Sequence, residues 1–384
     1  MTLRFRRITY IIFIIIFLVV TPAIILYAAG YRYNFQKHKL QKTGILILKS
    51  RPEGAQIYLN GDLQESNTPA HLANLVPEDY LIKIEKEGLY PWQKTLPVRS
   101  RTTTFAENIT LFKKNLPTEI ADGNITLSVL SPDNEKIVYL LENEKSEEVW
   151  LLNLKGYEKK LLYGTSLGDR LPNSNLEWSH DGQKILITIT DKSLKAKYII
   201  FDYRTQAATT YKYLDEFYFE FRGVAEKNAL GFAASEEFSL LPGSSSLLAV
   251  LNKKIQDLKI WNINSGDLIF ETEADSAAWS KNNDKILYTK NFEIWFYNPS
   301  SEQETLITRY SKEVKKIGWI NDNYILALLD NTLKAIELDE RDQRNVTDLL
   351  KLDDIKNFDI DPDGQKIYFI GSLGNKKGAF ELLY

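Results

Sequence analysis

Three aspartates near the C-terminus have the spacing of a calcium-binding loop. Asp359, Asp361 and Asp363 alternate with other residues and are followed by Gly364. Alternating carboxylates of this kind converge on one Ca²⁺ ion in an EF-hand loop. That loop ends with a bidentate glutamate, whereas the corresponding position here is Ile370. The same place in other parts of the chain has the composition of a tight turn, so we favour a turn and predict no metal ion or other cofactor.

Other residues that could do chemistry are few. The chain has three histidines and no cysteine, which excludes disulfides, thiolate metal sites and a cysteine nucleophile. His38, His71 and His180 stand in no spacing typical of metal-ligand or hydrolase motifs. We therefore predict that the protein is not an enzyme. A hydrolase or glycan-active enzyme stays open as the alternative, because a sequence does not show whether carboxylates from distant segments meet.

Aromatic residues between about Arg204 and Ser246 are the stronger candidates for binding. This stretch interrupts the pattern on either side of it, and loops that interrupt a regular fold often carry its binding surface. The alternative is a degenerate edge of the regular fold. The candidate partner-binding residues are Tyr211, Tyr213, Phe217, Tyr218, Phe219 and Phe221.

The regular part of the chain is a repeat, in which an apolar or aromatic residue leads into a Ser-X-Asp-Gly-type turn and two apolar runs follow. Copies stand at Leu130, Trp178, Trp279, Trp319 and Ile360, and a degenerate copy is expected at Leu240–Gly243. Four short strands with tight turns consume roughly 40 residues, which is the period of a propeller blade. The repeat therefore predicts a six-bladed β-propeller over residues 114–384.

The last repeat ends at its third strand. We expect residues around Pro117–Ala121 to supply the missing outer strand and close the ring. Tryptophans recur at two positions of the repeat, and we predict that they fill the space between blades rather than form a binding cage. They are Trp178, Trp279 and Trp319 in the first strand and Trp150, Trp261 and Trp295 in the third.

The N-terminal region is almost wholly apolar from Ile8 to Gly30 and carries no charge there. About 20 such residues cross a bilayer as a helix, so residues 8–30 are predicted to be a transmembrane helix, with a cleaved signal peptide as the alternative. Arg4, Arg6 and Arg7 favour a cytoplasmic location for residues 1–7. The later domains are then extracytoplasmic, behind a linker at residues 31–43.

Residues 44–113 show short strands with turn punctuation. Asn60 and Gly61 stand between apolar runs, which is a strong hairpin signal because both central residues of a type I′ turn need positive φ. Tyr80, Ile82 and Ile84 alternate along a further strand. The pattern predicts a small all-β sandwich.

The motifs of this stretch resemble the PEGA domain, from Pro52-Glu53-Gly54-Ala55 through Thr68-Pro69 to Lys86-Glu87-Gly88. The resemblance implies an extracytoplasmic structural or binding module and supplies no catalytic residues. The later repeat resembles TolB-like and WD40-like propeller repeats, most clearly from Trp178 to Ile185 and from Ile294 to Asn298.

Together these features predict an all-β protein behind one membrane span. We expect a binding or structural protein of the cell envelope whose partner is a protein or a cell-wall or surface polymer. The formal net charge of -3 provides no general basic field for a phosphate backbone, so nucleic acid is not an expected partner.

Overall fold

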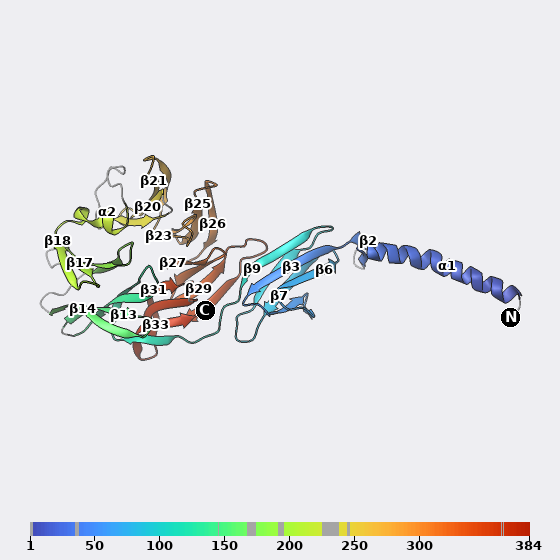
Figure 1. Cartoon of the computed structure of the whole chain (residues 1–384), viewed down its shortest axis with the longest axis horizontal. Helices are drawn as coiled ribbons and strands as arrows, with labels where there is room; N and C mark the ends of the chain where they lie inside the picture. The colour runs from blue at the N-terminus through green and yellow to red at the C-terminus, as the bar shows by residue number, and fades with distance from the viewer. Residues whose placement is uncertain are drawn as a thin grey trace. The chain divides into compact units, whose positions relative to one another are not determined.

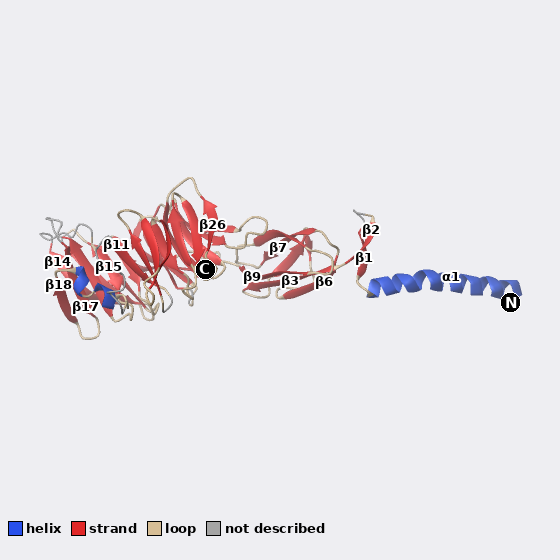
Figure 2. Cartoon of the chain, turned by 90° about the horizontal axis from the view of Figure 1, so that it is seen from above, coloured by secondary structure: helices blue, strands red, loops and turns tan. Residues whose placement is uncertain are grey.

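The computed structural model describes residues 3–34, 38–144, 146–166, 174–190, 196–224, 238–243, 246–361, 363 and 365–384. Apart from one long helix at the N-terminus, these residues form mostly strands (Figures 1 and 2). They divide into two compact units. The first unit comprises Met1–Lys114 with Asp339–Asn345, and the second comprises Asn115–Leu338 with Val346–Tyr384.

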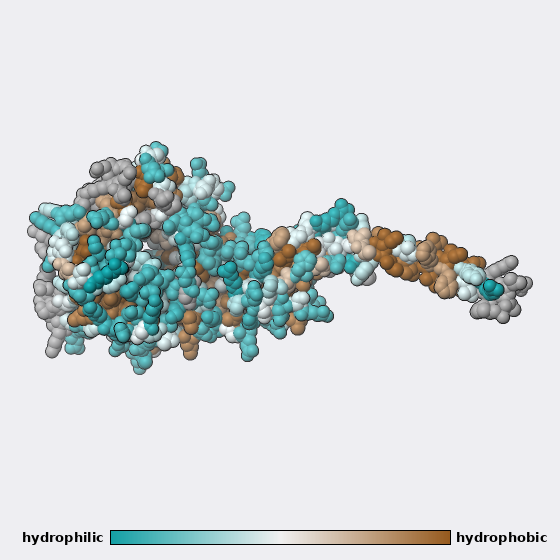
Figure 3. All heavy atoms as spheres, viewed as in Figure 1, coloured by the Kyte–Doolittle hydropathy of each residue, from teal (hydrophilic) through white to brown (hydrophobic). Residues whose placement is uncertain are grey.

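The N-terminal helix α1 (Leu3–Ala28) contains the predicted apolar span. Its segment Ile8–Ala28 is long and apolar enough to cross a membrane, and none of it is buried inside the protein. Figure 3 shows apolar residues along its length. At 1.5 Å per residue these 21 residues extend about 32 Å, which matches the hydrocarbon core of a bilayer. Pro22 lies inside the helix, and bilayer-spanning helices tolerate proline.

Two short strands follow α1 where a linker is expected. β1 (Tyr31–Asn34) and β2 (Lys39–Lys42) pair in antiparallel fashion and form a sheet of their own. The periodicity of so short and polar a segment does not reveal a strand, so this hairpin is visible only in the structure.

The predicted sandwich follows, with seven strands in two sheets. The sheet orders are β6-β3-β9 and β5-β4-β7-β8. At the predicted turn Asn60 and Gly61 have φ values of 51° and 93°, and β4 and β5 pair across it, so the hairpin is confirmed. The strands are β3 (Gly44–Arg51), β4 (Gln56–Leu59), β5 (Asp62–Leu63), β6 (Ala70–Leu75), β7 (Asp79–Glu85), β8 (Trp92–Pro97) and β9 (Thr103–Thr110).

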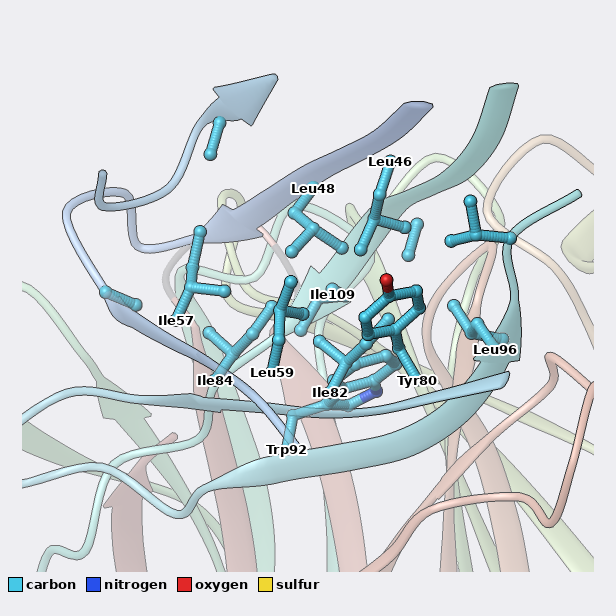
Figure 4. Close-up of a cluster of buried hydrophobic side chains, with 14 of the residues drawn as sticks. Leu46, Leu48, Ile57, Leu59, Tyr80, Ile82, Ile84, Trp92, Leu96 and Ile109 are labelled. Atoms are coloured by element: carbon cyan, nitrogen blue, oxygen red, sulfur yellow. The ribbon is translucent and has the colours of Figure 1, made fainter. Parts of the chain in front are cut away.

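The core of the sandwich comes from the inward-facing residues of both sheets (Figure 4). Leu46 and Leu48 on β3 face Ile82 and Ile84 on β7, and all four side chains are fully buried. β3, β4, β7 and β8 contribute alternate residues, as expected for two sheets that share one core. The predicted inward face of β7 is thereby confirmed.

The first unit also buries one lysine, Lys94 on β8. Its Nζ atom donates a 2.8 Å hydrogen bond to the carbonyl oxygen of Asp339 and lies 3.6 Å from Asp339 Oδ2. Burial raises the pKa of the Asp339 carboxyl, but hydrogen bonds from Arg341 and the charge of Lys94 outweigh this and lower its pKa. The pairing explains how an ammonium group is accommodated in the interior.

The second unit contains six four-stranded antiparallel sheets among its described residues. Each is one propeller blade, and the degenerate third blade lies where the repeat predicts it. Blade 1 consists of β11 (Ile125–Leu130), β12 (Lys136–Glu142), β13 (Ser146–Asn153) and β14 (Glu158–Ser166). Blade 2 consists of β15 (Asn175–Trp178), β16 (Lys184–Thr190), β17 (Ala196–Asp202) and β18 (Ala207–Tyr211). Blade 3 consists of β19 (Phe238–Pro242), β20 (Leu247–Asn252), β21 (Asp257–Asn262) and β22 (Leu268–Glu273). Blades 4 to 6 are β23 (Ser276–Trp279), β24 (Ile286–Lys290), β25 (Glu293–Asn298) and β26 (Gln303–Arg309); β27 (Val314–Asn321), β28 (Tyr324–Leu329), β29 (Thr332–Glu337) and β30 (Val346–Lys351); and β31 (Asp354–Asp361), β32 (Lys366–Leu373) and β33 (Lys376–Leu383) with β10 (Thr118–Asp122).

The sixth blade joins the two ends of the propeller sequence. Its outer strand is β10, which pairs with β33 from Thr118↔Glu381 to Asp122↔Gly378. The predicted outer strand is therefore confirmed. Since β31 contacts both β11 and β27, the sixth blade lies between the first and the fifth.

The repeated turn has a common hydrogen-bonding pattern. Ser131 and Ser179 are buried, and each hydroxyl donates to an aspartate two residues later, at 2.5 and 2.6 Å. Each hydroxyl also accepts the backbone N–H of the residue that begins the second strand, at 2.9 Å. The serine thus satisfies a buried backbone donor, which is the physical reason for its recurrence.

The first-strand tryptophans connect neighbouring blades by hydrogen bonds. The indole N–H of Trp178 donates to the Val129 carbonyl oxygen at 3.1 Å, Trp279 donates to Leu241 at 2.8 Å and Trp319 to Ala278 at 3.0 Å. Each acceptor lies on the first strand of the preceding blade. The predicted interblade role is confirmed for these three residues and includes a directional contact in addition to packing.

Candidate functional site

Among the described residues of the propeller, the junction between blades 2 and 3 is the one that contains helical turns. The repeat position that holds tryptophan in blades 2, 4 and 5 holds Pro242 in blade 3, so no indole can reach back to blade 2. The chain between the two blades forms the short helices η2 (Leu214–Glu216) and α2 (Tyr218–Phe221) instead. Figure 1 labels α2 between β18 and β20.

The interrupting segment is shorter than predicted. The expected insertion, from about Arg204 to Ser246, includes β18, which is the regular outer strand of blade 2, and β19, which is the first strand of blade 3. Alternation is weak in both strands, and for this reason their sequences resemble a loop. The irregular segment begins after Tyr211, and its part at 225–237 lies outside the described residues.

Aromatic side chains of this segment fill the space between the two blades. Phe217, Tyr218, Phe219 and Phe221 are all buried and share one core cluster with side chains of both blades. Phe217 packs edge to face against Tyr198 of blade 2, with ring centroids 6.0 Å apart. The cluster thus supplies the apolar contact that a direct blade-to-blade junction would otherwise provide.

A polar network accompanies these aromatic contacts. Tyr218 donates its hydroxyl proton to Glu177 Oε2 on β15 at 3.0 Å, and the same oxygen lies 3.6 Å from Arg222 Nη1. The Arg222 Nε and Nη2 atoms donate to the Leu240 carbonyl oxygen on β19, at 3.0 and 2.6 Å. Burial raises the pKa of Tyr218 well above its ordinary value, so the phenol stays protonated and donates. The network links blade 2 to blade 3 through α2.

A pocket of about 290 Å³ lies beside α2, on blade 2. One wall comes from the β15–β16 turn, a second from β17 and β18, and a third from α2 and the residues next to it. The lining residues are Ser179, His180, Asp181, Lys184, Ile200, Tyr211, Phe217, Glu220, Phe221 and Gly223. Backbone contact between His180 N–H and the Phe221 carbonyl oxygen, at 2.9 Å, ties α2 to the turn.

The pocket combines aromatic walls with ionisable groups of both signs. Burial raises the pKa of Asp181, but hydrogen bonds from the Ser179 hydroxyl and the Gln183 amide, together with the charge of Lys184, lower it by more. Asp181 is consequently a carboxylate at neutral pH. With Lys184 and Glu220 also present, the pocket offers both a cation and anions to a ligand, and such groups fix a ligand's orientation.

The six aromatic residues predicted to bind a partner have different environments. Phe217, Tyr218, Phe219 and Phe221 are buried, so they do not form the exposed aromatic surface that the sequence suggests. Phe217 and Phe221 nevertheless line the pocket together with Tyr211. Tyr213 is 57% exposed and is not among the lining residues. Partner binding by this segment stays a prediction. Apart from the exposed Tyr213, the candidate residues that a partner could reach are those that line the pocket.

Several pocket residues are not apparent from the sequence. His180 occupies the repeat position that holds Pro132 in blade 1 and Pro362 in blade 6, while Lys184 and Glu220 stand in no recognisable motif. The departure of His180 from the repeat is the one signal that could have drawn attention to this turn. The walls meet only because α2 folds back onto the β15–β16 turn.

The aspartates with calcium-loop spacing have other partners. Asp359 accepts the Leu130 amide proton at 3.1 Å and pairs with Lys316 Nζ at 3.0 Å, and Asp363 pairs with Lys281. Within the described ranges, no three His, Cys, Asp or Glu side chains are grouped so that they could hold a metal ion. Asp361 is buried at the end of β31, whereas Pro362 and Gly364 lie outside the described residues.

Comparison with known proteins gives one family match. The family model for the PEGA domain matches residues 43–115. A search of curated proteins found no match.

Similar solved structures include a chain of the crystal structure of the mitotic checkpoint complex, with 13% identity, a TM-score of 0.49 and coverage of 70% of this chain and 94% of that one. The β-propeller domain of the trilobed protease from Pyrococcus furiosus has 16% identity and a TM-score of 0.38, over 85% and 88% of the two chains. TolB from Acinetobacter baumannii has 14% identity and a TM-score of 0.38, over 79% and 63%. The family match identifies residues 43–115 as a PEGA domain, and the six four-stranded sheets of the second unit make it a β-propeller.

Proposed function

We propose that this protein is a membrane-anchored binding protein of the cell envelope, and that its propeller binds a protein or a cell-wall or surface polymer in the pocket beside α2. Residues 1–7 are cytoplasmic in this proposal, and the PEGA domain and the propeller are extracytoplasmic. The observation that carries the proposal is the pocket itself, because it lies where the blade repeat is interrupted. The apolar span of α1 and the PEGA domain support the location.

The lining of the pocket favours binding. Tyr211, Phe217 and Phe221 present aromatic surface, which contributes contact area with little loss of conformational entropy. Asp181 and Lys184 lie at the β15–β16 turn, which the Ser179 hydroxyl holds in place. A rigid, mixed lining of this kind discriminates among ligands by shape and charge.

Site-specific photo-crosslinking on intact cells tests the pocket. A photoreactive residue at Glu220, which is exposed and lines the pocket, is expected to capture a partner protein or a labelled surface polymer. The matched control carries the same residue at Leu161, on the outer strand of blade 1, where 48% of the side chain is exposed. The proposal is wrong if both positions capture the same products, or if neither captures any.

The charges of the pocket provide a second test. The double variant Lys184→Gln and Glu220→Gln leaves the aromatic walls in place and removes one charge of each sign. We expect it to lose the product captured through a photoreactive residue at Tyr213, a position outside the pocket in the same segment. The buried Tyr218 and Phe219 are unsuitable for this purpose, because their replacement perturbs the core between blades.

The absence of cysteine from the chain allows a direct test of orientation. A single Lys155→Cys variant has its thiol on an exposed turn of blade 1, where the lysine side chain is 72% exposed. A maleimide that does not cross membranes is expected to label it in intact cells. Labelling only after the cells are opened would place the propeller in the cytoplasm and overturn the proposed location.

A further inference from the structure

The hairpin of β1 and β2 has two chemically different faces. Its register pairs Tyr31 with Lys42 and Tyr33 with Leu40, and because side chains alternate along a strand, these four lie on one face. Arg32 pairs with Gln41 and Asn34 pairs with Lys39 on the opposite face. One face is therefore aromatic and aliphatic with a single lysine, and the other is polar.

The rest of the protein leaves much of the apolar face uncovered. Tyr33 is 47% exposed and Leu40 is 45% exposed, and among the described residues no third strand joins β1 and β2. A two-stranded hairpin alone is at best marginally stable in water, and it needs another surface against which to pack.

The hairpin starts directly at the end of the apolar helix. Thr43, just after β2, donates its amide proton to the Gly30 carbonyl oxygen at 2.9 Å and its hydroxyl proton to the same oxygen at 3.0 Å. The Arg32 guanidinium lies 3.6 Å from the ring centroid of Tyr27 on α1 and donates to the Tyr27 carbonyl oxygen at 2.9 Å. When Ile8–Ala28 spans a membrane, these contacts hold the hairpin at the boundary between lipid and water.

The charge of this region differs from that of the whole chain. The protein has a net charge of -3, yet no aspartate or glutamate occurs before Glu53. The described strands carry Arg32, Lys39 and Lys42. Strands of four residues reach about 13 Å, which exceeds the Debye length of about 8–10 Å. Arg32 and Lys42 stand beside the end of α1, so these two cations lie within electrostatic reach of the membrane surface. Lys39 at the far end comes within reach when the hairpin lies against that surface.

We propose that the β1–β2 hairpin docks on the surface of the membrane that α1 spans. Tyr31, Tyr33 and Leu40 then lie at the lipid–water boundary, where tyrosine is enriched. Lys42 on the same face contacts the headgroups of anionic phospholipids, and Arg32 and Lys39 on the opposite face add longer-range attraction to the same surface. This contact also gives a reason for the basic residues after the span. By the positive-inside rule alone, these residues would weigh against an extracytoplasmic C-terminus. The hairpin is thereby an anionic-lipid contact in addition to the anchor.

Two labelled full-length variants test the proposal in nanodiscs. Leu40→Cys and Gln41→Cys place single thiols on opposite faces of the hairpin, and each carries a nitroxide whose depth is measured by power-saturation EPR with oxygen and a water-soluble nickel complex. In nanodiscs of equimolar phosphatidylcholine and phosphatidylglycerol, the label at 40 should be shielded from nickel and the label at 41 should not. Phosphatidylcholine alone should reduce this difference, as should high salt.

Charge variants identify the interaction. Arg32→Gln, Lys39→Gln and Lys42→Gln together should abolish the shielding at position 40, since each basic residue removed weakens docking on an anionic surface by about fivefold. A matched variant replaces three exposed propeller lysines, Lys155, Lys281 and Lys376, by Gln and should keep the shielding. Thermal unfolding of both variants verifies that the folded units are intact.

Three results would overturn the proposal. The first is equal nickel access at positions 40 and 41 with anionic lipid, because the hairpin then has no membrane-facing side. The second is unchanged shielding in phosphatidylcholine alone, which would remove the role of anionic headgroups. The third is equal loss of shielding in both triple variants.

Discussion

Replacement of Trp279 tests the role of tryptophan between blades. Its indole N–H donates to the Leu241 carbonyl oxygen at 2.8 Å, and the ring packs against Gly243, where an added Cβ would lie 2.9 Å from the indole. Truncation of a buried tryptophan to alanine costs about 3–5 kcal/mol. Trp279 is only partly buried, so we expect Trp279→Ala to lie at the lower end, at about 3 kcal/mol.

Trp279→Phe separates packing from hydrogen bonding. Phenylalanine keeps much of the aromatic contact but has no N–H, so the expected cost is about 1–2 kcal/mol. The matched control is Trp295→Phe on the third strand of the same blade. The Trp295 indole donates to Glu293 at 2.8 Å, and Glu293 keeps Arg309 as a partner when the indole is removed. We expect that substitution to cost less than about 1 kcal/mol.

Thermal unfolding of the full chain in detergent measures these effects. Tryptophan fluorescence reports the propeller, since six of the seven tryptophans belong to it and only Trp92 belongs to the PEGA domain. A loss of about 3 kcal/mol corresponds to a Tm decrease of roughly 6–12 °C for a domain of this size. The reasoning is refuted if Trp279→Ala costs less than Trp295→Phe, or if Trp279→Phe has no effect on Tm.

Three further predictions concern ring closure, the blade 2–3 junction and the turns. Gly378→Ala should lower the propeller Tm by the equivalent of about 1–3 kcal/mol. The added Cβ would lie 2.1 Å from the Ala121 carbonyl oxygen, so it would separate β10 from β33. Deletion of residues 116–124 should destabilise the propeller further. Tyr218→Phe should cost about 1–2 kcal/mol in a urea titration, because Glu177 loses a hydrogen bond in a half-buried site. Asp181 has a lowered pKa. Its contribution to stability is therefore complete above about pH 4 and is lost as the pH falls through the folded-state pKa. Asp181→Asn should flatten the acid side of a plot of Tm against pH.

Controls distinguish these effects from general damage. Gly156→Ala introduces a Cβ at ordinary contact distance from Glu158 and at no positive φ, so it should leave the Tm unchanged. If Gly378→Ala is equally harmless, β10 does not hold the ring closed. A Tyr218→Phe variant as stable as the parent would show that Glu177 gains nothing from the phenol, and an unchanged acid profile in Asp181→Asn would remove that carboxylate from the pH dependence.

The outer strand of blade 6 was predictable, whereas the arrangement of the candidate site was not. The last repeat visibly lacks a fourth strand and Pro117–Ala121 has no other blade to join, so simple counting assigns β10 to β33. The aromatic residues of the irregular segment look the same in the sequence whether they face solvent or a core. Only the fold shows that Phe217 and Phe221 close a junction and line a pocket.

The sequence alone determined the local elements of this protein: the apolar span of α1, the Asn60-Gly61 hairpin and the serine-containing turns of the propeller. Each depends on residues a few positions apart, so it is visible as a pattern of residue types. The tertiary structure decided which distant groups meet. The contacts of Glu177 with Tyr218 and of His180 with Phe221 depend on how α2 folds back, and the two faces of the β1–β2 hairpin depend on how its strands pair. These contacts depend on the geometry of the whole unit, and no local sequence pattern encodes them.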